Sequence, residues 1–216
     1  MLRTLCGVAA LAVTATVASA GTVSGTYGWE DGGTVLGSFG GFNSENYTAG
    51  DPAFVYSGNS SLFVFEEPLG GTPQGYVAFI TGLSDGDVID ASFFAWDDTP
   101  GDSPSLRIWG HYAMSDDVNS YEGSAGGNNT FSGENVWTEL SHSWTFSTNE
   151  DGRDALVIEV RIYAGDETTN FGYVDDLSVT VTGADVSGVE INFAPAPGAL
   201  ALLAAGGFAG SRRRRA

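Results

Sequence analysis

Basic side chains are scarce in this chain of 216 residues. Lysine is absent, and the 8 basic residues are all arginines, against 27 aspartates and glutamates. Arg3 and Arg212 to Arg215 lie near the chain ends, where no acid occurs, so residues 21–194 carry a net charge of −24 from 27 acids and the remaining 3 arginines. Such a surface repels nucleic-acid phosphates, which excludes a nucleic-acid partner and suits neutral polymers or divalent cations. Solubility alone is the other explanation.

Cysteine is nearly absent. Cys6 is the only one and lies in an apolar N-terminal run, so no disulfide can stabilise the rest of the chain, and packing or a metal must do so. Histidine is also rare, and His111 and His142 fall on separate predicted strands without a metal-binding spacing. Asp97 and Asp98 lie in an acidic turn, where sequence cannot establish the fixed separation that a glycosidase needs. We therefore expect that the chain is not an enzyme.

The first 20 residues are typical of a secretory signal peptide. Arg3 provides the positive charge, residues 5–17 are apolar, and Ala18-Ser-Ala20 fits a small-x-small cleavage site. The run is too short to span a bilayer. We expect a signal helix, cleavage by signal peptidase after Ala20, and export.

The last residues form a three-part segment. It consists of Pro195-Ala-Pro197-Gly198, an apolar run over 199–210, and a basic cluster of Arg212, Arg213, Arg214 and Arg215. As a helix the apolar run is about 20 Å long, short of a ~30 Å hydrocarbon core, unless residues 191–197 extend it. This predicts a short C-terminal hydrophobic helix with its arginines on the cytoplasmic side. The alternative is a disordered basic tail.

The segment between these ends is rich in glycine, with 31 in the whole chain, and in short alternating runs. A run begins at residue 21, and others cover 34–39, 54–56, 60–65, 75–80, 88–96, 106–113, 136–146, 156–163 and 171–181. Residues 57–59 suggest a hairpin or a tight connection, and residues 114–134 a long loop. About ten such runs predict an all-β antiparallel sandwich over 21–183, then a linker over 184–194 with one further run at 189–193.

One charged residue interrupts the apolar phase of the run over 171–181. Phe171, Tyr173, Leu177 and Val179 share that phase with Asp175. A buried carboxylate is costly unless it is paired, hydrogen-bonded or bound to a metal. Asp175 is therefore predicted to be buried with a partner.

The C-terminal segment resembles the bacterial PEP-CTERM sorting signal, with Pro195-Ala-Pro197 in place of Pro-Glu-Pro and the cluster from Arg212 through Arg213 and Arg214 to Arg215 at the end. The resemblance implies a transient inner-membrane anchor, processing by an exosortase-like protease over 195–216, and delivery to the cell surface or extracellular matrix.

Residues 22–182 resemble a jelly-roll carbohydrate-binding module of the galactose-binding-like superfamily. The resemblance rests on four stretches in order: Trp29–Gly32, Ser57–Leu62, Gly82–Gly86 and Tyr173–Ser178. It implies a non-catalytic module with a structural Ca²⁺ between Glu30 and Asp175. The alternative is that Asp175 caps a turn or pairs with an arginine.

A sugar site needs aromatic faces beside polar groups. The candidates are Trp96, Trp109, Tyr112 and Tyr163, although aromatic residues in strands more often belong to the core. We expect an exported module that binds a neutral polysaccharide, or an acidic one bridged by calcium. The alternatives are a structural surface protein without a small ligand, and a glycoside hydrolase.

Overall fold

A computed structural model describes residues 20–48, 50–98, 105–148, 152–163 and 171–194. The predicted signal helix, including Ala18 of its cleavage site, lies outside these residues, and Ala20 is the first of them. The predicted sorting segment at 195–216 also lies outside them, with all of its named residues: Pro195, Pro197, Gly198, Arg212, Arg213, Arg214 and Arg215. Both segments therefore stay predictions. Across the described ranges, no helix is both long and apolar enough to cross a membrane.

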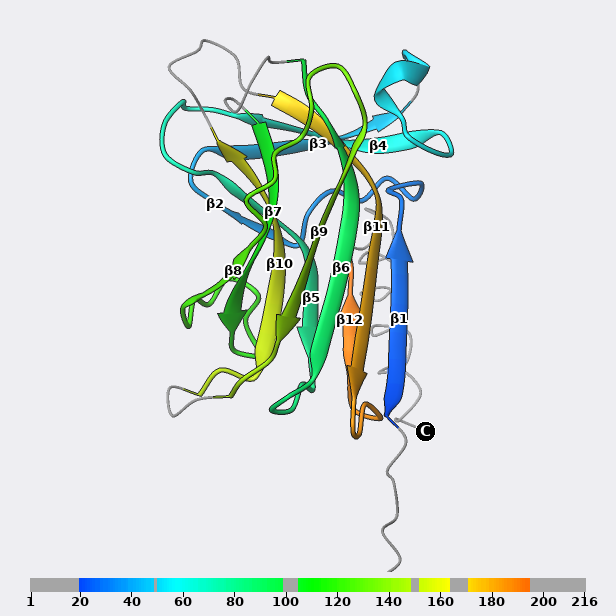
Figure 1. Ribbon diagram of the computed structural model, residues 1–216. Coiled ribbons are helices and arrows are strands. Elements are labelled where there is room, and N and C mark those ends of the chain that lie inside the picture. The colour runs from blue at the N-terminus through cyan, green and yellow to red at the C-terminus, as the bar shows by residue number, and fades with distance from the viewer. Residues whose placement is uncertain (1–19, 49, 99–104, 149–151, 164–170, 195–216) are drawn as a thin grey trace, which may run out of the picture.

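The described residues fold into two antiparallel sheets that pack face to face (Figure 1). The first sheet has the order β3 (Phe42–Thr48), β4 (Ser60–Glu66), β11 (Phe171–Gly183), β6 (Val88–Trp96), β9 (Thr138–Thr145), and β1 (Gly21–Tyr27) pairs with β11. The second has the order β12 (Glu190–Asn192), β5 (Gln74–Thr81), β10 (Ala155–Tyr163), β7 (Ser105–Ala113), β8 (Ser124–Gly127), and β2 (Gly37–Phe39) pairs with β5. The predicted all-β sandwich is confirmed.

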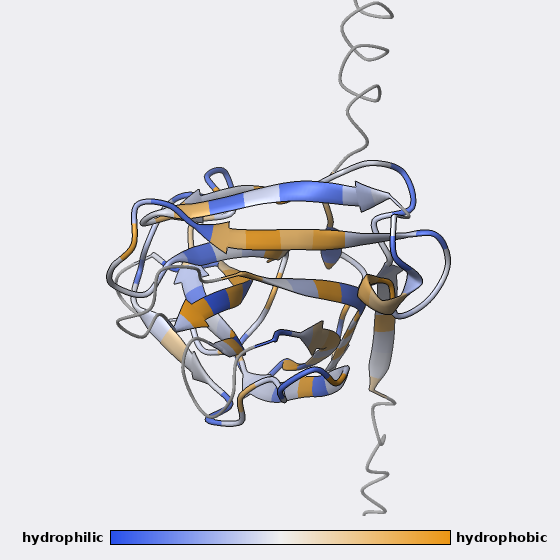
Figure 2. Ribbon diagram, turned by 90° about the horizontal axis from the view of Figure 1, so that it is seen from above, coloured by the Kyte–Doolittle hydropathy of each residue, from blue (hydrophilic) through white to orange (hydrophobic). Residues whose placement is uncertain are grey.

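The core lies between the sheets, where the strands place their apolar side chains. Figure 2 shows apolar stretches, in orange, along the strands. In β10, Leu156, Ile158 and Val160 point inward and are fully buried. In β6, Ile89 and Phe93 do the same from the opposite sheet. The remaining positions of β7, β10, β6 and β11 form the two outer faces, which carry the polar and charged side chains discussed below.

A bulge in β11 changes which residues face the core. The pairing of β11 with β6 shifts between Asp175 and Ser178, and Asp176 has a φ of 50°. Val174 points into the core before the bulge, and Leu177 does so after it. Asp175 is fully buried, as predicted, but it lies on the outer face beneath a loop and not between the sheets.

Three segments differ from their predicted structure. The run at 54–56 is not a strand, because Pro52–Phe54 forms a short 3₁₀ helix with Asp51 as its cap. Residues 57–59 are therefore a tight connection into β4 and not a hairpin between two strands. The polar stretch Phe42–Thr48 is a strand with no clear alternation, and the long loop at 114–134 contains the glycine-rich strand β8. The further run predicted at 189–193 is present as β12, which pairs with β5 and belongs to the second sheet.

Candidate functional site

The structure places the four predicted sugar-binding aromatics in three environments. Trp109 of β7 and Tyr163 of β10 are partly exposed on the outer face of the second sheet. Trp96 lies on the outer face of the first sheet and is 8% exposed, because Phe54 and Tyr173 cover it. The alternation of β7 turns Tyr112 inward, where its ring contacts Phe146. Of the four aromatic residues, only Trp109 and Tyr163 lie on the same surface.

Around Trp109 and Tyr163 lies what we call the arginine–aromatic face: Arg107, Trp109, Phe131, Arg161 and Tyr163. The Arg107 guanidinium carbon lies 3.6 Å from the Phe131 ring centre and 4.3 Å from that of Tyr163. The corresponding carbon of Arg161 lies 4.8 Å from the Trp109 ring centre. Cation–π contacts of this kind hold arginine side chains in place. All five side chains are partly exposed, so the face can be reached from solvent.

A buried charged cluster supports this face from below. Glu159 is 0% exposed and accepts hydrogen bonds from His111 Nδ1 and from Arg161 Nε. His111 is also buried, between the rings of Tyr76 and Tyr121, and its Nε2 has no partner among the described residues. Burial and the Glu159 carboxylate raise the pKa of Tyr76, while Arg161 opposes them. The buried carboxylate of Glu159 accepts from both the His111 ring and the Arg161 guanidinium, and this fixes the position of Arg161.

Sequence reasoning selected the two aromatics of this face but missed the charged residues between them. The signal was present in the strand phase. Arg107 and His111 share the strand phase of Trp109 in β7, and Glu159 and Arg161 share that of Tyr163 in β10. Because β7 and β10 are antiparallel neighbours, Glu159 lies opposite Trp109, and Arg161 lies opposite Arg107. Phe131 carried no such signal, since it comes from the segment after β8.

The two predicted calcium ligands, Glu30 and Asp175, both hold the loop over residues 56–60. Asp175 Oδ2 accepts backbone N–H groups of Tyr56 and Ser57, both at 3.0 Å, and its Oδ1 accepts the N–H of Asp176 at 2.8 Å. Glu30 Oε1 accepts the N–H groups of Asn59 and Ser60 at 2.8 and 3.0 Å. Burial raises the pKa of Asp175 to about 6, although these N–H groups oppose it. The hydrogen bonds lower the pKa of the exposed Glu30.

These contacts do not fit a calcium ion shared by Glu30 and Asp175. Calcium takes six to eight oxygen ligands, whereas one oxygen of each carboxylate already accepts two N–H groups. In the part of the chain that the structure describes, no three His, Cys, Asp or Glu residues form a group that could hold a metal. The geometry matches the alternative in which Asp175 caps a turn. Calcium binding here stays a prediction.

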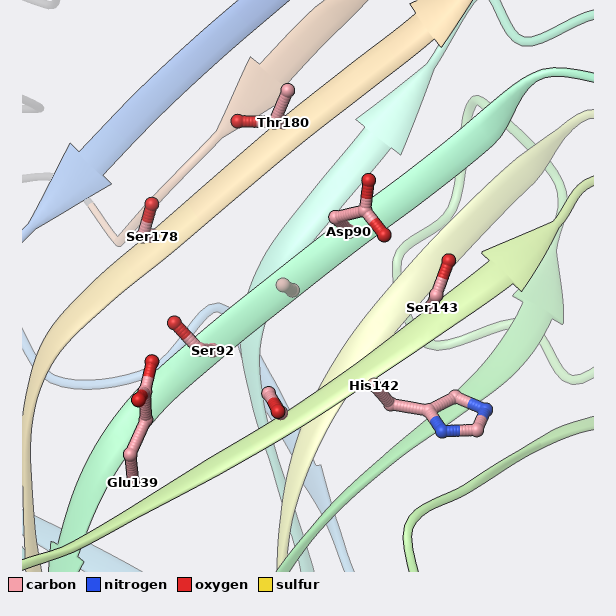
Figure 3. Close-up of a pocket in the computed structure, with 9 residues that line it drawn as sticks. Asp90, Ser92, Glu139, His142, Ser143, Ser178 and Thr180 are labelled. Carbon is pink, nitrogen blue, oxygen red and sulfur yellow. The ribbon is translucent and has the colours of Figure 1, made fainter.

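The outer face of the first sheet carries a second candidate site, a polar hollow of about 480 Å³. Figure 3 shows Asp90 and Ser92 of β6, Glu139 and Ser143 of β9, and Ser178 and Thr180 of β11 around it. Hydroxyl and carboxylate groups could hydrogen-bond a sugar. Among the described residues, its lining includes no Trp, Tyr or Phe ring on which a sugar could stack, so it is the weaker candidate.

Comparison with solved structures finds carbohydrate-binding modules. The CBM22-2 xylan-binding domain of Xyn10C from Paenibacillus barcinonensis aligns with a TM-score of 0.53 and 18% identity, over 72% of this chain and 97% of that domain. The CBM22-1 domain of the same protein gives 0.48 and 15%, over 74% and 94%. A Stig cyclase, Fisc from Fischerella sp. TAU, gives 0.45 and 11%, over 76% and 86%.

No family model matches the sequence, and no curated protein sequence does. At 18% identity, the likeness to the first xylan-binding domain shows the fold alone, the jelly-roll sandwich predicted from the sequence. Which residues bind a ligand must be argued from this chain's own side chains.

Proposed function

We propose that this chain is an exported, non-catalytic module that binds polysaccharide on its arginine–aromatic face. The observation that carries the proposal is the meeting of Trp109 and Tyr163 with Arg107 and Arg161 on one partly exposed surface. Aromatic rings offer stacking surfaces to the C–H faces of sugars, and fixed guanidinium groups donate to sugar hydroxyls. The likeness to a xylan-binding domain makes a polysaccharide the first class of ligand to test.

The test is affinity electrophoresis in gels that contain soluble xylan, β-glucan or galactan. Trp109→Ala should weaken binding by at least roughly tenfold, since a stacked aromatic anchor is a dominant contact in a small binding site. Trp137→Ala is the matched control, because Trp137 is partly exposed and donates from Nε1 to Ala53 O, away from the arginine–aromatic face. Retention by no glycan would favour the structural surface protein. Release of reducing sugar would favour a hydrolase.

Export is part of the same proposal. Its support is the small-x-small site at Ala18 to Ala20 and the ordered C-terminal segment from Pro195 to Arg215. The intact mass of the native protein should lack residues 1–20 after signal peptidase and the terminal arginines after an exosortase-like protease. Full-length chain recovered from the cytoplasm would contradict export.

A further inference from the structure

The arginine–aromatic face gathers two of the three arginines in a strongly acidic domain. Arg107 and Arg161 are direct partners across β7 and β10. The third, Arg153, stacks on Tyr112 and is not part of this face. Two like charges opposite each other in a sheet repel, so the pair costs stability unless an anion compensates it. The acids elsewhere in the domain make this local positive charge more distinctive.

The charges of the two arginines are compensated differently. Arg161 donates from Nε to the buried carboxylate of Glu159, which also accepts from His111. Arg107 forms no ion pair with any residue that the structure describes, and its contacts there are the two rings and a long 3.5 Å hydrogen bond from Nη1 to Asn129 Oδ1. Its Nε is buried without a hydrogen-bond partner among the same residues. Arg107 is therefore a partly exposed guanidinium held between two rings, with no acid paired to it among the described residues.

We propose that Arg107 binds the carboxylate of a uronic acid residue in the polysaccharide; this rests on the proposed function. A guanidinium matches a planar carboxylate through two parallel N–H···O hydrogen bonds, and a guanidinium already held by aromatic rings loses little side-chain entropy on binding. Trp109 and Tyr163 would stack the neighbouring neutral sugars. The −24 charge of residues 21–194 repels a polymer that is acidic at every sugar. We therefore expect the ligand to be a mainly neutral chain with sparse uronic acid side groups.

The experiment compares glucuronoxylan with the same preparation after chemical reduction of its carboxyl groups, by isothermal titration calorimetry on the purified protein. The native protein should bind the unreduced polymer about tenfold more tightly, the size of one charge-assisted contact. Arg107→Gln should remove that preference while it still binds the reduced polymer. Arg153→Gln, the matched control away from this face, should keep the preference. Added NaCl should shrink it, because the contact is between opposite charges.

The outcomes separate the two proposals. Equal affinity of the native protein for both polymers, or a preference that survives Arg107→Gln, would overturn the assignment to Arg107 and leave polysaccharide binding intact. Binding to neither polymer would remove the proposed function, and the uronic acid assignment with it. Circular dichroism and the melting temperature of each variant verify that a lost preference does not come from unfolding.

Discussion

Asp175 and Glu30 hold the same loop, yet their ionisation has opposite consequences for stability. Asp175 is buried and its pKa is raised from 3.8 to about 6, so the folded state binds its proton more tightly than the unfolded state does. Its contribution is therefore most favourable below pH 4 and declines as pH rises to about 6. The pKa of Glu30 is lowered, so its contribution exists above its ordinary pKa and is lost as pH falls.

We predict that Asp175→Asn becomes relatively more stable as pH rises. The unfolding free energy of the variant minus that of the native protein should increase by roughly 1–2 kcal/mol between pH 4 and pH 7, after allowance for solvent screening. Urea denaturation at several pH values measures this difference. Asp185→Asn is the control, because the pKa of that exposed aspartate is lowered and its pH trend should have the opposite sign. A difference that stays constant with pH would show that Asp175 is not held with a raised pKa.

A chelator should leave the melting temperature unchanged if backbone N–H groups are the partners of Glu30 and Asp175. Metal that binds only the folded state raises stability by mass action, so its removal would lower the melting temperature by several degrees. Differential scanning calorimetry with EDTA and with added CaCl₂ decides whether N–H groups or calcium are the partners of the two carboxylates. A calcium-dependent shift that disappears in Asp175→Ala would support the calcium prediction and require the loop to rearrange.

The bulge in β11 is the feature that sequence alternation could not locate. Alternation identified β11 as a strand and Asp175 as buried, but it assigned one inward phase to the whole run. The inserted Asp176 reverses that phase, so Tyr173 packs on the outer face against Phe54 and Trp96. A bulge is set by pairing between distant strands, here β11 with β6, which no local pattern encodes.

The same limit explains the other differences. Strands with clear alternation, such as β6, β7 and β10, lie within one residue of their predicted ranges. In contrast, β3 is largely polar and β8 is Ser-Ala-Gly-Gly, so each forms a strand through its neighbour and not through its own composition. For the candidate site, the sequence indicated the rings of Trp109 and Tyr163, whereas the contacts of Glu159 depend on the register of β7 against β10.

The bulge can be tested directly. Asp176 has a φ of 50°, which a β-branched side chain adopts only under strain, and its Oδ1 also accepts from Ser57 Oγ. Asp176→Val should therefore lower the unfolding free energy by about 2 kcal/mol. Asp176→Asn should be nearly neutral, because asparagine tolerates this conformation and keeps the acceptor. Ser178→Val, on the same outer face, controls for the change in polarity. Equal effects of the two valines would mean that no bulge exists at Asp176.

The excess of acids over arginines should make the stability of the domain depend on ionic strength. A net charge of −24 over residues 21–194 repels itself more in the compact folded state than in the expanded chain. Added NaCl screens this repulsion, so the melting temperature should rise steadily with salt. KCl at equal ionic strength should give the same curve. A melting temperature that falls with salt would indicate that local ion pairs outweigh the net charge.

The edge strands β1 and β12 determine how the domain would respond to a pulling force. Both run upward in Figure 1, β1 begins where Gly21 pairs with Gly183, and Phe193 just after β12 stacks on Tyr27 at the end of β1. Tension between residues 20 and 194 would act along both strands, so their ladder hydrogen bonds would have to break together. The same tension between residues 20 and 184 would peel β1 from β11 one pair at a time. Single-molecule pulling should need a larger force in the first geometry than in the second. Such resistance would suit the proposed role of a module held between a surface and a polymer. Equal forces in the two geometries would contradict this arrangement of the edge strands.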